Sequence, residues 1–249
     1  MQILLACAKI MTGTAPASLP LTTTPTVLPQ AEDNIRQLLR YSPEELQGML
    51  RCNPSIASEN WHRYRQFHNA DSALPAIFAY DGMVFQKLSP ETFSPDDLLY
   101  ANDHLLIGSF LYGLLRPLDR VHPYRLEGDV VLPDNGVAMF DYWKPILTDW
   151  FISRIQADDG ILVNLASNEV KDLFDWKRVE REVAVVTPQF KVDKGGKLST
   201  VVIYTKMCRG SMARWILQHR LTHHSSLRHF TYEGYSLPSD AKDWVFVNR

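Results

Sequence analysis

Short apolar runs alternate along this chain with amphipathic segments, and this alternation is its strongest constraint on folding. The first run, "MQILLACA" (1–8), predicts a buried strand, and "LLIGSFLYGLL" (105–115) predicts a buried strand and turn. "DGILVNLAS" (159–167) is a third run, rich in Ile, Leu and Val. None approaches the ~20 apolar residues that a transmembrane helix needs. The pattern predicts a mixed sheet with helices around it, and no membrane partner.

Three further segments have strand composition. They are "DVVLPDN" (129–135), "EREVAVVTPQFKV" (180–192) and "KLSTVVIYTK" (197–206). Four prolines at positions 16, 20, 25 and 29 exclude a regular helix or central strand between the first strand and residue 30. That segment is expected to be extended and at the surface.

Helix signals occupy much of the remaining chain. Ser42, Pro43 and Glu45 form a capping-box pattern, and Ser94, Pro95 and the two aspartates after them are typical of the start of another helix. Asp81-Gly82 lies between apolar runs and fits either a hairpin or a helix that ends in a left-handed glycine. Further helices are expected at 31–41, 53–68 and 211–221. We therefore predict one compact α+β domain over residues 1–249, with a mixed central sheet flanked by helices.

Charge is unevenly distributed. The whole chain has a net charge of −2, but residues 170–249 carry 14 Lys+Arg against 8 Asp+Glu, a local charge of +6. Only this C-terminal third has an electrostatic case for polyanions. The three cysteines, Cys7, Cys52 and Cys208, are widely spaced and include no C-x-x-C pair, which favours a cytoplasmic, reducing location.

The stretch "IYTKMCRGSMARWILQHRL" (203–221) collects cations beside a glycine. If it is helical, Lys206, Arg209 and Arg214 lie near one side, and Gly210 could permit close approach of an anion. The alternative is a solvated helix face with salt bridges. Cys208, beside Arg209, could sense peroxide, but a buried structural thiol is the preferred interpretation.

Three other places carry candidate site residues. Asn164, Ser167 and Glu169 follow an apolar strand, where open α/β sheets place ligands, although Ser167 could simply cap the next helix. Arg116 and Arg125 lie among Leu and Pro residues, as anion contacts or as structural ion pairs, for example Arg116 with Asp119. Lys9 ends the first strand and fits an anion contact, a base with lowered pKa or a surface lysine.

Metal and cofactor signatures are weak. His219 and His223 have i, i+4 spacing, but no third ligand pattern accompanies them. No phosphate loop, dinucleotide fingerprint or nucleophile elbow is present. The sequence predicts neither a metal site nor a cofactor.

Several blocks together resemble the YaaA-type family of peroxide stress response proteins. They are "ACAKIMT" (6–12), "PLTTTPTVLP" (20–29), "AIFAYDGMVFQKL" (76–88), "SFLYGLLRPLDRVHPYRLE" (109–127), "NLASNEV" (164–170), "TKMCRGSMARWI" (205–216), "EGYSL" (233–237) and "WVFVNR" (244–249). Ala6 departs from the family pattern, where Ser is usual, and Met207-Cys208 replaces a common Lys-Ala pair. The resemblance implies an unusual α/β topology, a cytoplasmic protein that limits iron-dependent peroxide damage, and binding of duplex or branched DNA through a basic cleft.

Two functional hypotheses follow. In the first, a DNA-binding protective protein meets phosphates with Lys9, Arg116, Arg125, Asn164, Lys206, Arg209 and Arg214. In the second, an enzyme acts on a small anionic or nucleotide-like substrate, with Lys9, Asn164, Ser167, Glu169, Lys206 and Arg209 in one pocket. Glu169 is the candidate acid or base in that pocket. Both require residues from the start, middle and end of the chain to meet in one hollow.

Overall fold

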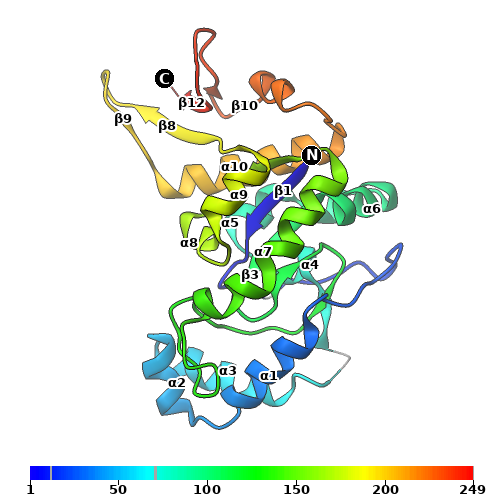
Figure 1. The fold of residues 1–249 in the computed structure, drawn as a ribbon, viewed down its shortest axis with the longest axis vertical. Coiled ribbons are helices and arrows are strands. Elements are labelled where there is room, and N and C mark those ends of the chain that lie inside the picture. The colour runs from blue at the N-terminus through cyan, green and yellow to red at the C-terminus, as the bar shows by residue number, and fades with distance from the viewer. Residues whose placement is uncertain (12, 70–71, 249) are drawn as a thin grey trace.

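Strand β1 (Gln2–Ala6) lies at the centre of a five-stranded sheet in the computed structural model of the chain (Figure 1). It pairs in parallel with β3 (Leu105–Ser109) on one side and with β6 (Ile161–Asn164) on the other. β6 pairs in parallel with β7 (Ala184–Val186), and β4 (Gly113–Leu115) runs antiparallel to β3. The order β4-β3-β1-β6-β7 confirms a mixed sheet.

The structure describes residues 1–11, 13–69 and 72–248. Thr12, which ends the first of the family-like blocks, and Arg249, which ends the last, lie outside the described residues. The described residues form a single compact α+β domain, as expected.

Burial on both faces explains why the central strands are apolar throughout. All five residues of β3 are buried, and Ile3, Leu4 and Leu5 of β1 are fully buried. Parallel sheets need cover on both faces. Figure 1 shows α7 (Met139–Asp158) crossing in front of the sheet, and α7 packs on β6 and β4. α6 (Pro95–His104) packs on β3 and lies behind in this view.

A second five-stranded sheet holds the C-terminal part of the chain. Its order is β10-β11-β12-β8-β9, and β12 runs parallel to β8. The rings of Phe190, Phe230 and Phe246 pack together on it. Its strands are β8 (Gln189–Asp193), β9 (Leu198–Ser199), β10 (Thr231–Tyr232), β11 (Tyr235–Ser236) and β12 (Val245–Asn248).

Three helices form the lower end of the molecule in Figure 1, and side chains cap the second and third of them. They are α1 (Leu28–Leu38), α2 (Pro43–Leu50) and α3 (Pro54–Arg65). The Ser42 hydroxyl accepts from the amide of Glu45, whose carboxylate accepts from the Ser42 amide, so the predicted capping box is confirmed. Asn53 caps α3 through the amide of Ile56.

The remaining elements connect these layers. They are β2 (Leu74–Pro75), α4 (Ala76–Ala79), α5 (Met83–Leu88), η2 (Pro90–Thr92), β5 (Arg120–Val121), α8 (Asn168–Lys171), α9 (Trp176–Glu182), α10 (Val202–Gln218) and η3 (His224–His229).

Three local predictions were wrong. The segment 197–206 is a strand only at Leu198–Ser199, because α10 already begins at Val202 and its packing on α5 outweighs the β propensity of Val and Ile. Asp81-Gly82 joins two short helices, and Gly82 caps α5 with a negative φ of −117°. Residues 129–135 form a turn with a single bridge between Val131 and Ala138.

Gly210 serves helix packing. A Cβ at Gly210 would lie 2.1 Å from the carbonyl oxygen of Val84 and 2.9 Å from Cβ of Lys87, both on α5. The missing side chain therefore lets α10 approach the backbone of α5. The space beside Gly210, where an anion could have approached, is occupied by the neighbouring helix α5.

We expect Gly210→Ala to destabilise the fold by about 1–3 kcal/mol, because the new methyl group meets backbone that cannot rotate away. Gly48→Ala is the matched control: Gly48 is also helical, but nothing lies within 4 Å of its added Cβ. Gly48→Ala should be neutral or stabilise by up to about 1 kcal/mol through helix propensity. Urea unfolding measures both. A Gly210→Ala chain as stable as its parent would contradict the packing role.

Candidate functional site

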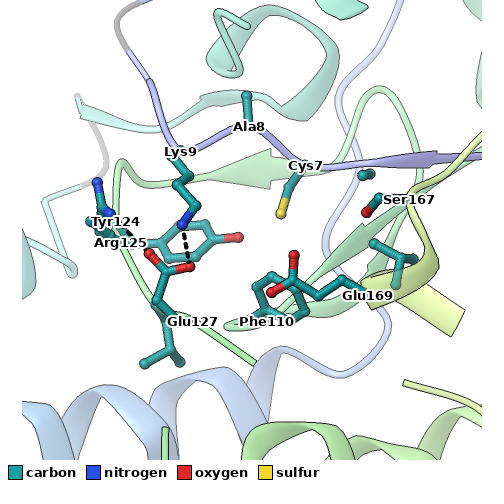
Figure 2. A pocket seen from close by; sticks show the side chains of 12 residues that line it. Cys7, Ala8, Lys9, Phe110, Tyr124, Arg125, Glu127, Ser167 and Glu169 are labelled. Atoms are coloured by element: carbon teal, nitrogen blue, oxygen red, sulfur yellow. Dashed lines mark ion pairs between the residues drawn. The ribbon is translucent and has the colours of Figure 1, made fainter. Parts of the chain in front are cut away.

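The carboxyl ends of β1, β3 and β6 meet at one edge of the central sheet. The chain runs from β1 to β3 on one side and later returns to β6 on the other, so β1 flanks a topological switch point. Such points are where open α/β sheets bind ligands. A pocket lies there whose cavity volume is about 60 Å³, or about 450 Å³ when the open space at its mouth is included (Figure 2). Its lining residues are Ala6, Cys7, Ala8, Lys9, Phe110, Tyr124, Arg125, Leu126, Glu127, Ser167, Glu169 and Val170.

Two glycines bring the walls of this pocket together. A Cβ at Gly108 in β3 would lie 2.5 Å from Cγ1 of Val170, so the bare backbone of β3 lets α8 lie against it. A Cβ at Gly82 would lie 2.8 Å from Cβ of Ala8. The amide of Cys7 donates to the carbonyl of Gly108 at 3.0 Å and fixes the segment after β1.

Buried hydroxyl groups anchor the wall formed by residues 124–127. The Tyr124 hydroxyl lies 2.6 Å from Oγ of Ser109 and 3.0 Å from the hydroxyl of Tyr80. The Tyr64 hydroxyl donates to the carbonyl of Arg125. Burial raises the pKa of Tyr124 well above its usual value, so the phenol stays protonated. The wall is fixed before any ligand arrives.

Glu127 is the charged centre of the pocket. Its side chain is only 7% exposed, and it forms ion pairs with Lys9 (Nζ to Oε2, 2.8 Å) and Arg125 (Nη2 to Oε1, 3.0 Å), as Figure 2 shows. At the rim, Arg51 pairs with Asp129. A carboxylate this buried needs both partners, because unpaired buried charge is strongly destabilising.

Glu169 differs from Glu127 because it is exposed and no described residue forms an ion pair or hydrogen bond with its carboxylate. This carboxylate faces the hollow beside Sγ of Cys7 in Figure 2. Partial loss of water and the charge of Glu127 raise the pKa of Glu169, while Lys9 opposes the shift. Burial raises the pKa of the Cys7 thiol to about 12, so this thiol is protonated near neutral pH.

The structure brings four predicted site residues together: Lys9, Arg125, Ser167 and Glu169 all line the pocket. Ser167 is the N-cap of α8, but its side chain makes no capping hydrogen bond and is free to line the pocket. Asn164 is buried at the end of β6 and does not line the pocket; its side-chain oxygen accepts from the amide of Ala166 at 3.2 Å.

The other predicted cations lie elsewhere. Arg116 donates to Asp119 at 2.8 Å, and Asp119 is fully buried, so the structural ion-pair interpretation is confirmed for this pair. Arg214 donates to the carbonyls of Leu88 and Ser89 and thereby holds the end of α5.

The remaining α10 cations also stay outside the pocket. Burial lowers the pKa of Arg209, whose Nε has no hydrogen-bond partner within the described part of the chain. Lys206 is exposed on α10. Because α10 packs on α5, α6 and β8, its cations point in several directions, and the structure does not gather them with Lys9 and Glu169.

Sequence reasoning missed Glu127, Tyr124, Cys7 and the Arg51–Asp129 pair. A signal for Glu127 existed: in an extended segment, residues two apart point to the same side, which pairs Glu127 with Arg125. Cys208 is fully buried, in agreement with the interpretation as a structural thiol, and burial raises its pKa to about 12. In the ranges that the structure describes, no group of three or more His, Cys, Asp or Glu side chains could hold a metal ion, and no helix is long and apolar enough to cross a bilayer.

Comparison with known proteins decides the family. The family model described as "Peroxide stress protein YaaA" matches residues 1–241. The chain belongs to the YaaA family of peroxide stress proteins. A UPF0246 protein of Phocaeicola vulgatus is 52% identical over 95% of this chain and 93% of its own length. UPF0246 proteins of Bacteroides fragilis (52%, covering 100% and 98%) and Ralstonia nicotianae (36%, covering 99% and 98%) are also similar. A general role in peroxide stress follows from this membership.

The raised pKa of Glu169 has a consequence for stability. Folding penalises the ionised form, so the penalty is absent below the pKa of the unfolded chain and fully present above the folded pKa. Glu169→Gln removes it. We expect the variant to melt at a higher temperature than the parent at pH 7 and at nearly the same temperature near pH 4. A lower melting temperature at pH 7 would show that the Glu169 carboxylate stabilises the fold instead.

Proposed function

We propose that the pocket is an active site for acid–base chemistry on a small polar substrate, used in the peroxide stress response. One observation carries this proposal: a carboxylate that has a raised pKa and no ion pair with any described residue faces a pocket at the switch point of the sheet. Catalytic acids and bases are tuned in this way, because a pKa nearer the working pH makes proton transfer efficient in both directions.

Each lining residue then has a role. Glu169 accepts or returns the proton. Lys9, 62% exposed but tied to Glu127, presents a fixed positive charge where negative charge develops. The Ser167 hydroxyl offers a donor or acceptor to the substrate. Glu127, held by Lys9 and Arg125, positions Lys9, and the phenol of Tyr124 closes the wall.

Glu169→Gln should abolish protection in a peroxide survival assay, using a strain that lacks its own copy of the gene. The amide keeps the shape of the side chain but cannot accept a proton. Asp172→Asn is the matched control: Asp172 is an exposed carboxylate three residues further on that does not line the pocket. Survival with Asp172→Asn should equal that of the parent at equal protein levels. Full protection by Glu169→Gln would refute the proposed chemistry.

DNA binding is a second candidate, favoured by a different observation. Lys194, Lys197 and Lys206 are exposed on the β8–β9 hairpin and the start of α10, within the third of the chain that carries a charge of +6. We propose that these lysines, in place of the buried or ion-paired arginines, meet phosphates of duplex or branched DNA. Limitation of iron-dependent damage and a cytoplasmic location stay predictions of the family resemblance.

Replacing Lys194, Lys197 and Lys206 with Ala should flatten the dependence of log affinity on log salt by about 3, since each lost phosphate contact removes about 0.9. Fluorescence anisotropy with a labelled duplex measures the slope. Alanine at Arg36, Arg40 and Lys144, which pair with acids outside the basic C-terminal third, removes the same charge and should leave the slope unchanged. Equal slopes for the two triple variants would exclude this surface as the DNA site.

A further inference from the structure

The charges around the pocket and its rim do not favour an anion. Three cations, Lys9, Arg51 and Arg125, face three carboxylates, Glu127, Asp129 and Glu169. Every one of these cations is in an ion pair, with Glu127 or Asp129 as its partner. The six charges therefore sum to zero, and Glu169 is the carboxylate that has no ion pair with any described residue. A ligand that enters the pocket meets this carboxylate, whose nearest compensating charge is that of Lys9.

An anionic ligand would face two costs. If it displaced Glu127 from Lys9 and Arg125, a carboxylate that is only 7% exposed would lose its partners. If it left those pairs intact, it would lie close to Glu169 with the same sign of charge. Neither cost applies to a ligand that donates hydrogen bonds.

Part of the pocket wall is apolar. Ala6, Ala8 and Val170 line the pocket together with the ring of Phe110. A small planar group can lie against such walls while its polar edge reaches the carboxylate. N–H donors to an ionised carboxylate form short, charge-assisted hydrogen bonds.

We propose that the pocket binds the cationic or N–H-donating end of a small planar molecule, with Glu169 as the acceptor. The substrate class is thus an amine, an amidine or a heterocycle with an amidine-like edge, in place of the small anion expected from the sequence. This inference rests on the proposed active site, because the same carboxylate that would exchange the proton also selects its donor.

Three probes with one ring and different charge test the proposal: benzamidine, benzamide and benzoate. Binding to the full chain is measured by calorimetry at pH 7.5. Benzamidine should bind, benzamide more weakly, and benzoate not at all. Glu169→Gln should weaken benzamidine about 10- to 100-fold, the usual worth of a charge-assisted hydrogen bond. Asp172→Asn should change the affinity less than about twofold, because Asp172 does not line the pocket and acts on Glu169 only as an exposed charge nearby.

A second measurement needs no variant. As the pH falls through the pKa of Glu169, benzamidine should dissociate from the parent chain, whereas a site without a titrating carboxylate would hold it. Tighter binding of benzoate than of benzamidine, or equal benzamidine affinity in Glu169→Gln, overturns the inference. If benzoate binds more tightly and Glu169→Gln still abolishes peroxide protection, the charge preference is wrong and the acid–base proposal survives. If benzamidine binding requires Glu169 but Glu169→Gln still protects against peroxide, the charge preference is right and the acid–base proposal is wrong.

Discussion

The ion pairs of Glu127 with Lys9 and Arg125 join the end of the central strand to a segment more than a hundred residues later in the chain. Strand β1 is buried on both faces and paired on both edges, so the sheet fixes where Lys9 emerges. The Tyr64, Tyr80 and Ser109 contacts fix the position of residues 124–127. The pairs therefore close a pocket between two walls that packing has already placed. Glu169 reaches the same pocket from α8, which can lie on β3 because Gly108 has no side chain.

Two carboxylates in one pocket are given different roles by their surroundings. Glu127 is buried and neutralised by two cations. Glu169 shares the pocket but forms no ion pair within the described part of the chain, and partial desolvation and the charge of Glu127 raise its pKa. Pairs of titratable groups with such contrasting environments are typical of sites that move protons. The arrangement makes the pocket electrically mixed, which distinguishes it from a phosphate-binding groove lined by free cations.

The cations of α10 show how residue type alone can mislead. The guanidinium of Arg214 donates hydrogen bonds to backbone carbonyls at the end of α5, and Gly210 leaves space for the backbone of that helix. These residues hold two helices together. Cations that remain exposed, such as Lys194, Lys197 and Lys206, lie near the second sheet, away from the residues that line the pocket. The positive charge of the C-terminal third and the pocket at β1 are thus separate features of the molecule.

The sequence by itself determined the elements whose signals are local. Capping at Ser42 and Ser94, the apolar strands at 2–6, 105–109 and 161–164, and polar residues after strand ends all depend on neighbours within a few positions. Lys9, Ser167 and Glu169 were found by that rule. Only the tertiary structure decided that Glu127 joins them, that α10 replaces a strand of β-branched residues, and that Arg116 and Arg214 are structural. Those outcomes depend on which distant backbone and side chains lie opposite each residue, and no spacing along the chain encodes those partners.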